Sequence, residues 1–121
     1  MPPRILIIDD SALILASTRA ALEGAGYEVA TAETVEAFER ERRRLQPDLI
    51  LVDVQMPEAF GDDVVMTLRE VYGERARVLL LSSLSPEELA ERAARSGADG
   101  WITKGSGLTA LVAKIRTLLP T

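Results

Sequence analysis

Three acidic residues stand where two apolar segments end. Asp9 and Asp10 directly follow the aliphatic residues 5–8. Asp53 follows the aliphatic residues 49–52 in the same way. Such runs are typical of strands buried in a parallel sheet, whose binding sites lie beyond the carboxyl ends of the strands. Carboxylates gathered there repel one another without a cation, whereas Mg²⁺ binds one or two carboxylates and keeps positions for phosphate oxygens. These positions predict magnesium-dependent phosphate chemistry.

Two later apolar segments also end in polar residues. Ser82 follows residues 77–81, and Lys104 follows residues 100–103. Because parallel strands end at one edge of a sheet, a hydroxyl and an ammonium are expected beside the three carboxylates. Asp53 would attack phosphorus as a nucleophile and form an aspartyl phosphate. Mg²⁺ and Lys104 would neutralise the phosphoryl oxygens, and Ser82 would hydrogen bond to the phosphoryl group.

Short apolar segments alternate with helical segments along the whole chain. The predicted strands are residues 4–9, 27–31, 48–53, 77–82 and 100–104. Each is followed by a segment with helical periodicity, which is the pattern of a parallel sheet covered by helices on both faces. We therefore expect an α/β domain built from five strand and helix units.

Three of the helical segments have apolar stripes at helical spacing. The stripe residues are Ile14, Ala21, Leu22 and Ala25 in the first, Val64, Val65, Leu68, Val71 and Tyr72 in the third, and Leu108, Leu111, Val112, Ile115, Leu118 and Leu119 in the last. We interpret these stripes as faces packed on the sheet and not as cofactor-binding motifs.

The fourth helical segment begins with a capping signal. Residues 85–88 combine an N-cap serine, a proline at the first helical position and a glutamate three residues after the serine, which predicts a capping box. The apolar residues that follow are Leu89, Ala90, Ala93 and Ala94. Since alanines bury little surface, this helix is a candidate for movement.

Composition limits the classes of function. The 121 residues are expected to form one domain, residues 1–121. A formal net charge of -5 argues against nucleic acid as a main partner. The cluster of Arg40, Arg42, Arg43 and Arg44 is interleaved with glutamates, which favours a solvated helix face over an anion site. The chain has no cysteine, so disulfides and thiol chemistry are excluded.

The apolar segments are too short for a membrane protein. The N-terminal residues lack the apolar region and cleavage site of a signal peptide, and no later run is long enough to cross a bilayer. We expect a soluble cytoplasmic protein.

Five sequence segments, in order and at suitable spacing, match one known family. They are residues 5–11, residues 47–57 with Gly61 after them, residues 79–83, residues 96–102, and the pair Thr103 and Lys104. Over its full length the chain resembles the receiver domain of bacterial two-component response regulators, and it is most similar to the single-domain, chemotaxis-type members. The resemblance implies a flavodoxin-like (βα)5 three-layer sandwich with a parallel five-stranded sheet in the order 2-1-3-4-5.

The resemblance also implies a metal site. Asp53 is the implied phosphoacceptor, and Asp10, Asp53 and the backbone carbonyl of Gln55 are the implied direct ligands of Mg²⁺. Asp9 is implied to bind the ion through water. From the residues alone, Asp9 or Asp10 has a second interpretation, as an N-cap of the first helix.

The same resemblance implies that three further residues act in switching. Ser82 corresponds to the switch hydroxyl, Lys104 to the lysine that pairs with the phosphoryl group, and Trp101 to an aromatic that turns inward when the hydroxyl moves. The alternatives are a turn serine, a solvated lysine and an aromatic packed at the surface. The implied phosphodonor is a histidine kinase or histidine phosphotransfer protein. The implied output is a changed surface of the fourth helix, fifth strand and fifth helix, which signals to a downstream protein.

Gly105 departs from the family, which usually has a proline there after a cis peptide bond. Because a cis bond before a non-proline residue costs roughly 2.5 to 4 kcal/mol, we predict a trans bond between Lys104 and Gly105. Glycines at 105 and 107 and Ser106 suggest a mobile loop that holds the lysine less rigidly.

Two other positions lead to hypotheses about kinetics and docking. Leu84 has no group to orient an attacking water, so with Gln55 nearby we expect slow self-dephosphorylation. Leu13, Ile14 and Leu15 cannot all face inward, and an exposed Leu13 near the acidic residues is a candidate contact for the phosphodonor, or alternatively a local part of the core.

Three functions follow from these features. The first is a phosphorylated receiver that is a monomer or weak dimer and not a turnover enzyme. The second is a pseudo-receiver that acts as an interaction module without phosphorylation, which Gly105 supports. The third is a small magnesium-dependent phosphatase, against which Gln55 stands where a second acid would be needed.

Overall fold

The computed structural model describes residues 1–57 and 59–121. Within these residues, strands and helices alternate along the chain. The strands are β1 (Arg4–Ile8), β2 (Glu28–Ala32), β3 (Leu49–Asp53), β4 (Arg77–Ser82) and β5 (Gly100–Thr103). The helices are α1 (Ala12–Gly24), α2 (Val35–Leu45), α3 (Gly61–Glu70), α4 (Pro86–Ser96) and α5 (Leu108–Leu118), with a short 3₁₀ turn, η1 (Lys104–Ser106), before α5. The predicted strands agree with the observed ones to within one residue at each end.

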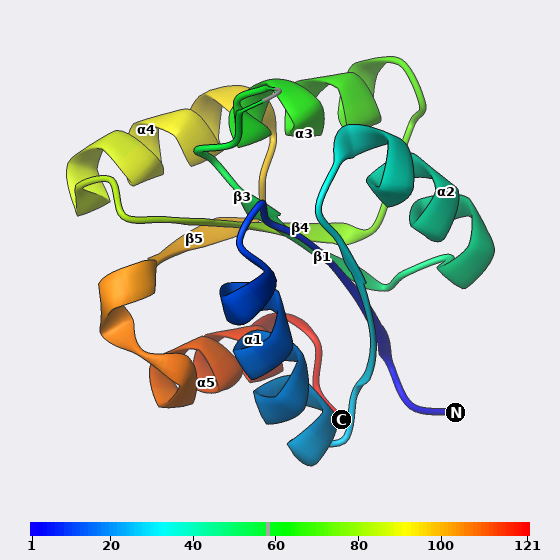
Figure 1. The fold of residues 1–121 in the computed structure, drawn as a ribbon. Helices are drawn as coiled ribbons and strands as arrows, with labels where there is room; N and C mark the ends of the chain where they lie inside the picture. The colour runs from blue at the N-terminus through cyan, green and yellow to red at the C-terminus, as the bar shows by residue number, and fades with distance from the viewer. Residues whose placement is uncertain (58) are drawn as a thin grey trace.

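The strands form one parallel sheet in the order β2-β1-β3-β4-β5. Helices α1 and α5 cover one face, and α2, α3 and α4 cover the other (Figure 1). This arrangement confirms the flavodoxin-like three-layer fold. It also brings the carboxyl ends of the five strands to one edge.

Two apolar clusters hold the helices on the sheet. Ile5 and Ile7 of β1 point to the face covered by α1 and α5, while Leu6 and Ile8 point to the other face. All four side chains are essentially inaccessible to solvent. Side chains alternate between the faces of a strand, so a strand buried on both sides reads as a continuous aliphatic run. Phe38 of α2 is the largest fully buried side chain of the described residues.

Two predicted helix stripes are displaced in the structure. The centre of the α1 stripe is Leu15 and Leu22, with Ile14 only half-buried. In the third helix, Val71 and Tyr72 are 70% and 51% exposed, so their assignment to the core is wrong. Helix α3 ends at Glu70, Leu68 is its last buried residue, and Val71 and Tyr72 lie in the turn that follows.

The start of α4 partly matches the predicted capping box. The Ser85 hydroxyl accepts a hydrogen bond from the backbone N–H of Glu88 at 3.2 Å, and Pro86 begins the helix. The Glu88 carboxylate accepts instead from Arg92, at 3.3 Å. Leu89 is fully buried, so the helix has one large apolar contact in addition to its alanines.

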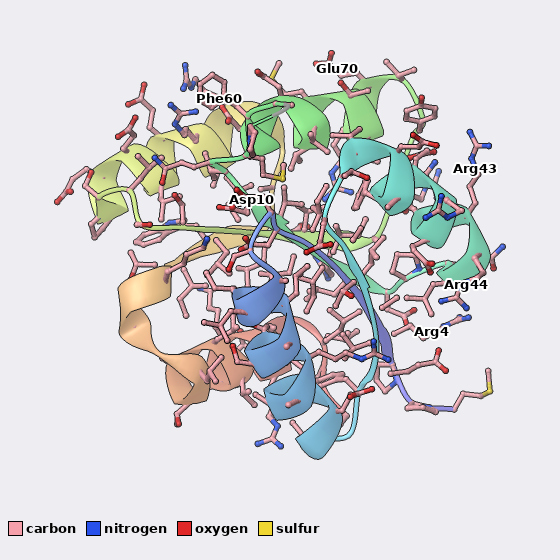
Figure 2. All side chains as sticks on the ribbon, viewed as in Figure 1. Arg4, Asp10, Arg43, Arg44, Phe60 and Glu70 are labelled. Atoms are coloured by element: carbon pink, nitrogen blue, oxygen red, sulfur yellow. The ribbon has the colours of Figure 1, made fainter. Side chains whose placement is uncertain are left out.

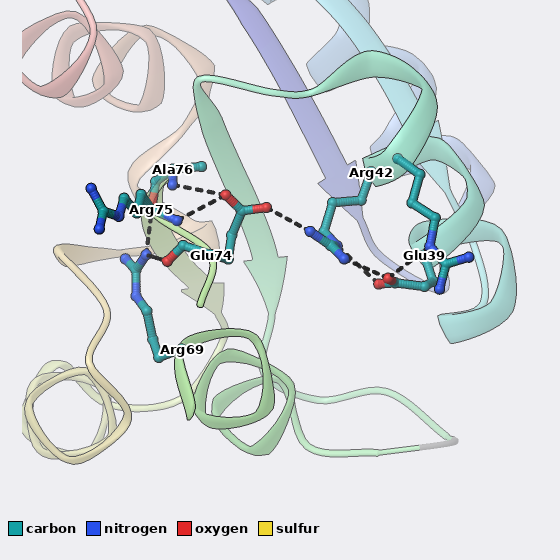
Figure 3. Close-up of polar contacts among 7 residues, drawn as sticks. Glu39, Arg42, Arg69, Glu74, Arg75 and Ala76 are labelled. Carbon is teal, nitrogen blue, oxygen red and sulfur yellow. Dashed lines mark hydrogen bonds and ion pairs between the residues drawn. The ribbon is translucent and has the colours of Figure 1, made fainter. Parts of the chain in front are cut away.

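The arginines of α2 are of two kinds. Arg43 and Arg44 are exposed and point away from the domain, as predicted (Figure 2). Arg42 differs, because its side chain is only 15% exposed and donates hydrogen bonds to Glu39 and Glu74 (Figure 3). Its guanidinium also lies 5.2 Å from the centroid of the Tyr72 ring. The expectation of a fully solvated face is therefore wrong for Arg42, which ties α2 to the turn after α3.

In the described part of the chain, the helices are all too short or too polar to span a bilayer.

Candidate functional site

The sheet brings the predicted site residues to its carboxyl edge. Asp9 follows the last residue of β1, Asp53 ends β3 and Ser82 ends β4. Each of these three side chains is at most 1% exposed. Lys104 follows β5, and the exposed Asp10 lies beside the ends of the strands (Figure 2).

The three aspartates form an acidic cluster. Asp9, Asp10 and Asp53 each present a carboxylate oxygen, and these oxygens lie within 4.8 Å of one another. One oxygen of each buried aspartate is held by the backbone two residues on. Ser11 N–H donates to Asp9 Oδ1 at 2.9 Å, and Gln55 N–H donates to Asp53 Oδ1 at 3.2 Å. These bonds fix the carboxylates before any ligand binds.

The second oxygen of Asp53 has no such support. Asp53 Oδ2 is buried and has no hydrogen-bond partner among residues 1–57 and 59–121. A buried carboxylate oxygen without a partner costs desolvation free energy, and a ligand that binds this oxygen would offset that cost. With the exposed Asp10 carboxylate within reach, the site offers the hard oxygen donors that Mg²⁺ prefers. The residues present therefore fit a divalent cation.

The electrostatics of Asp53 are unusual for a carboxylate. Burial, assisted by the negative charge of Asp9, raises the pKa of Asp53 from 3.8 to about 6, although Lys104 acts in the opposite direction. Burial and a neighbouring like charge both disfavour the ionised form. A cation bound here would relieve both effects, because it stabilises the carboxylate that is otherwise unfavourable.

Lys104 reaches the cluster despite Gly105. Its ammonium lies 3.0 Å from Asp9 Oδ2 and 3.5 Å from Asp53 Oδ1. The side chain is 23% exposed, so it enters the site from the rim. The described residues include no cis peptide bond, which confirms the trans bond predicted between Lys104 and Gly105. The lysine begins η1, and the Thr103 and Ser106 hydroxyls bond to each other across this turn at 2.6 Å.

Neither Asp9 nor Asp10 caps the first helix. The N-cap residue of α1 is Ser11, whose hydroxyl accepts from the N–H of Ile14 at 3.3 Å. Asp9 acts one residue earlier, by accepting from the N–H of Ser11. The capping interpretation is therefore wrong, and the two carboxylates are left for the acidic cluster.

Ser82 ends β4 at the carboxyl edge of the sheet, and Trp101 lies on the neighbouring strand β5. The Ser82 hydroxyl donates to the side-chain carbonyl of Gln55 at 3.2 Å and accepts from the N–H of Leu84 at 3.2 Å. Trp101 is half-buried against the cluster that joins the sheet to α2, α3 and α4. Sequence reasoning considered both the backbone and the side chain of Gln55 but missed the contact of that side chain with Ser82, which joins positions 27 residues apart.

Gly61 is a second residue whose role the sequence did not reveal. A Cβ placed on Gly61 would lie 2.2 Å from the backbone oxygen of Asp53. Its N–H also donates to the carbonyl of Val54 at 2.8 Å. The first turn of α3 can thus pack directly against the backbone of Asp53 only because the residue has no side chain.

Comparisons with known proteins agree with this geometry. A family model described as the response regulator receiver domain matches residues 5–116. The transcriptional regulatory protein PrrA of Mycobacterium tuberculosis is 35% identical over 117 residues, which are 97% of this chain and 50% of PrrA. The chain spans about half the length of the curated relatives it matches.

Two solved structures have the same fold. The chemotaxis protein CheY4 of Vibrio cholerae superposes with a TM-score of 0.88 at 28% identity, over 98% of this chain and 100% of CheY4. The BeF₃-activated receiver domain of DrrB, from Thermotoga maritima, superposes with a TM-score of 0.84 at 27% identity, over the whole of both chains.

Proposed function

This chain belongs to the response regulator receiver domains, and we propose that residues 1–121 act as a phosphorylated receiver that accepts a phosphoryl group on Asp53. The observation that supports this role best is the Asp53 carboxylate, which is buried but has one oxygen without a partner among the described residues. The other oxygen of Asp53, Oδ1, lies 3.5 Å from the Lys104 ammonium, and the Asp10 carboxylate belongs to the same acidic cluster.

The chemistry at Asp53 is a simple displacement. A carboxylate oxygen of Asp53 attacks phosphorus, the bond from phosphorus to the donor nitrogen of a phosphohistidine breaks, and that nitrogen keeps the electron pair. Lys104 pairs with a phosphoryl oxygen, because its ammonium has three donors and already lies 3.5 Å from Asp53. Bound Mg²⁺ supplies positive charge that stabilises the phosphoryl oxygens during transfer.

The resemblance to receiver domains supplies the proposed metal ligands, and the acidic cluster supports them. Asp10, Asp53 and the backbone carbonyl of Gln55 would bind Mg²⁺ directly. Asp9 would act through water, since its Oδ1 accepts from Ser11 N–H and its Oδ2 pairs with Lys104. An aspartate with both oxygens engaged is better suited to an indirect contact than to a direct one.

The proposed donor is a histidine kinase or a histidine phosphotransfer protein. Leu13 is 80% exposed at the start of α1, close in sequence to the acidic residues, and would contact that donor. The proposed output is a change at the surface of α4, β5 and α5 that a downstream protein reads. The domain acts stoichiometrically in this scheme, so it is not a turnover enzyme.

The pseudo-receiver alternative is not favoured. Its main support was Gly105, which replaces the proline that usually aims the lysine. Lys104 nevertheless lies 3.0 Å from Asp9 and 3.5 Å from Asp53. The substitution therefore does not remove the ammonium from the site.

Mass measurement after incubation with Mg²⁺ and acetyl phosphate tests the proposal. We expect an adduct of one phosphoryl group, which chelation of Mg²⁺ or the substitution Asp53→Asn abolishes. Consumption of the donor without an adduct would instead indicate a phosphatase. An unmodified chain with intact donor would indicate a pseudo-receiver.

A further inference from the structure

The hydroxyl of Ser82 makes one hydrogen bond as a donor and one as an acceptor in this structure. It donates its single proton to the side-chain carbonyl of Gln55 at 3.2 Å and accepts from the N–H of Leu84 at 3.2 Å. Ser82 is completely buried, so water does not compete for these bonds at the serine. Because a serine hydroxyl has one proton, Ser82 cannot donate to a phosphoryl group while it donates to Gln55.

Gln55 is anchored so that its side chain can reach Ser82. Its backbone N–H donates to Asp53 Oδ1, and Gln55 also forms an isolated antiparallel bridge with Phe60. The Gly61 N–H bond to Val54 closes the same loop. Gln55 therefore contacts both Asp53, through its backbone, and Ser82, through its side chain.

We propose that Gln55 is a positioning residue that restrains the Ser82 hydroxyl in the unphosphorylated state, and that this restraint must be released for the domain to switch. The proposal rests on the proposed function. A phosphoryl oxygen is charged and accepts a stronger hydrogen bond than a neutral amide, so the exchange favours the switched state once Asp53 is modified. The residue is exposed, so its freed carbonyl is hydrated by water after release.

The restraint lowers the affinity for a phosphoryl analogue. A ligand that needs Ser82 released binds more weakly when the released form is a minor one. For a single neutral hydrogen bond, the difference is roughly two- to tenfold in affinity. Removing the Gln55 acceptor should therefore strengthen binding of the analogue, whereas loss of a merely structural residue should weaken it.

Beryllofluoride with Mg²⁺ is the probe, and fluorine NMR separates the bound from the free ligand. We expect Gln55→Met, which keeps the length of the side chain but lacks the acceptor, to bind beryllofluoride roughly two- to tenfold more tightly than the unsubstituted chain. In a Ser82→Ala background the same substitution should have no effect, because the restrained hydroxyl is absent. Ser83→Ala is the matched control, since Ser83 is an exposed neighbouring hydroxyl, and it should leave the effect of Gln55→Met intact.

Equal or weaker binding by Gln55→Met, or an equal effect with and without Ser82, would overturn the restraint. Failure of the proposed function is distinguishable from this result. In that case the unsubstituted chain would not bind beryllofluoride in a manner that depends on Asp53 and Mg²⁺.

Discussion

The ammonium of Lys104 lies 3.0 Å from Oδ2 of Asp9, although a glycine follows the lysine. This ion pair spans the sheet edge from β5 to β1. The same ammonium lies 3.5 Å from Asp53 Oδ1, so the lysine reaches both buried carboxylates without a proline after it. The peptide bond between Lys104 and Gly105 is trans.

The substitution pair Gly105→Ala and Gly107→Ala tests how this loop is held. A Cβ on Gly105 meets nothing within 4 Å, and Gly105 has no positive φ, so alanine should stabilise the fold by about 0.4 to 1 kcal/mol. Gly107 has a φ of 88° and ψ of 168°, a region that alanine avoids, so the second substitution should destabilise by about 1 to 3 kcal/mol. Urea unfolding measures the free energy of unfolding of both variants. Equal effects of the two substitutions would contradict the difference in backbone conformation between Gly105 and Gly107.

The metal-free stability of the domain should depend on the ionisation of Asp53. The folded protein keeps the Asp53 proton up to a pKa of about 6, whereas the ordinary value is 3.8. Folding therefore takes up a proton between these values, and the Asp53 contribution to the free energy of unfolding should fall by up to about 3 kcal/mol as pH rises from about 4 to about 7.

Thermal or urea unfolding at several pH values, in the presence of a chelator, checks this pH dependence. The difference in unfolding free energy between the unsubstituted chain and Asp53→Asn separates the contribution of Asp53 from that of the other carboxylates. Asp53→Asn should be the more stable protein at neutral pH. Added Mg²⁺ should stabilise the unsubstituted chain more at neutral than at acid pH, because the metal needs the ionised carboxylate. If the difference in unfolding free energy between the two proteins did not change with pH, the raised pKa of Asp53 would be refuted.

Gly61→Ala should disturb both stability and phosphorylation. The new Cβ would lie 2.2 Å from the backbone oxygen of Asp53 and 2.8 Å from Val52 Cγ1, so the backbone must move. We expect a loss of about 1 to 3 kcal/mol in unfolding free energy, together with slower adduct formation from acetyl phosphate. Gly24→Ala is the control, since nothing lies within 4 Å of its added Cβ. It should stabilise α1 by up to about 1 kcal/mol and leave the adduct rate unchanged.

Arg92 should be the main polar anchor of α4. Its guanidinium donates to Asp62 at 2.9 Å, bonds to Glu88 at 3.3 Å, and lies 5.3 Å from the centroid of the Phe60 ring. Arg92→Met leaves the buried Asp62 carboxylate without this partner, so we expect a loss of about 1 to 3 kcal/mol in urea unfolding. Arg95→Met, at an exposed site on the same helix, should cost less than about 1 kcal/mol. Comparable losses in the two variants would rule out the anchoring role.

Leu13→Glu should separate docking from chemistry. Leu13 is 80% exposed, so the substitution should leave stability within about 0.5 kcal/mol. Loss of a central apolar contact typically weakens a complex by more than about 1 kcal/mol, so transfer from the cognate phosphodonor should slow at least about fivefold at subsaturating donor. Transfer from acetyl phosphate should not change. Ala20→Glu, at an exposed position later on α1, is the control, and equal slowing with both donors would remove the docking role of Leu13.

The sequence by itself determined the elements and the chemistry at their ends. Aliphatic runs such as residues 5–8 and 49–52 predict strands buried on both faces, because side chains alternate between the faces of a strand and an unbroken apolar run leaves no face for solvent. The residues that follow those runs must then lie at the carboxyl edge of a parallel sheet. Asp9, Asp53 and Lys104 were found in this way.

Only the tertiary structure decided which side chains meet across the fold. The Ser82 bond to Gln55, the Arg92 bond to Asp62 and the Arg42 bond to Glu74 join residues 27, 30 and 32 positions apart. Sequence patterns describe one element at a time, whereas these contacts depend on how two elements pack. The same reason explains the errors for Arg42 and Tyr72, because a charged helix face becomes buried, or an apolar stripe exposed, only when a neighbouring turn is placed against it.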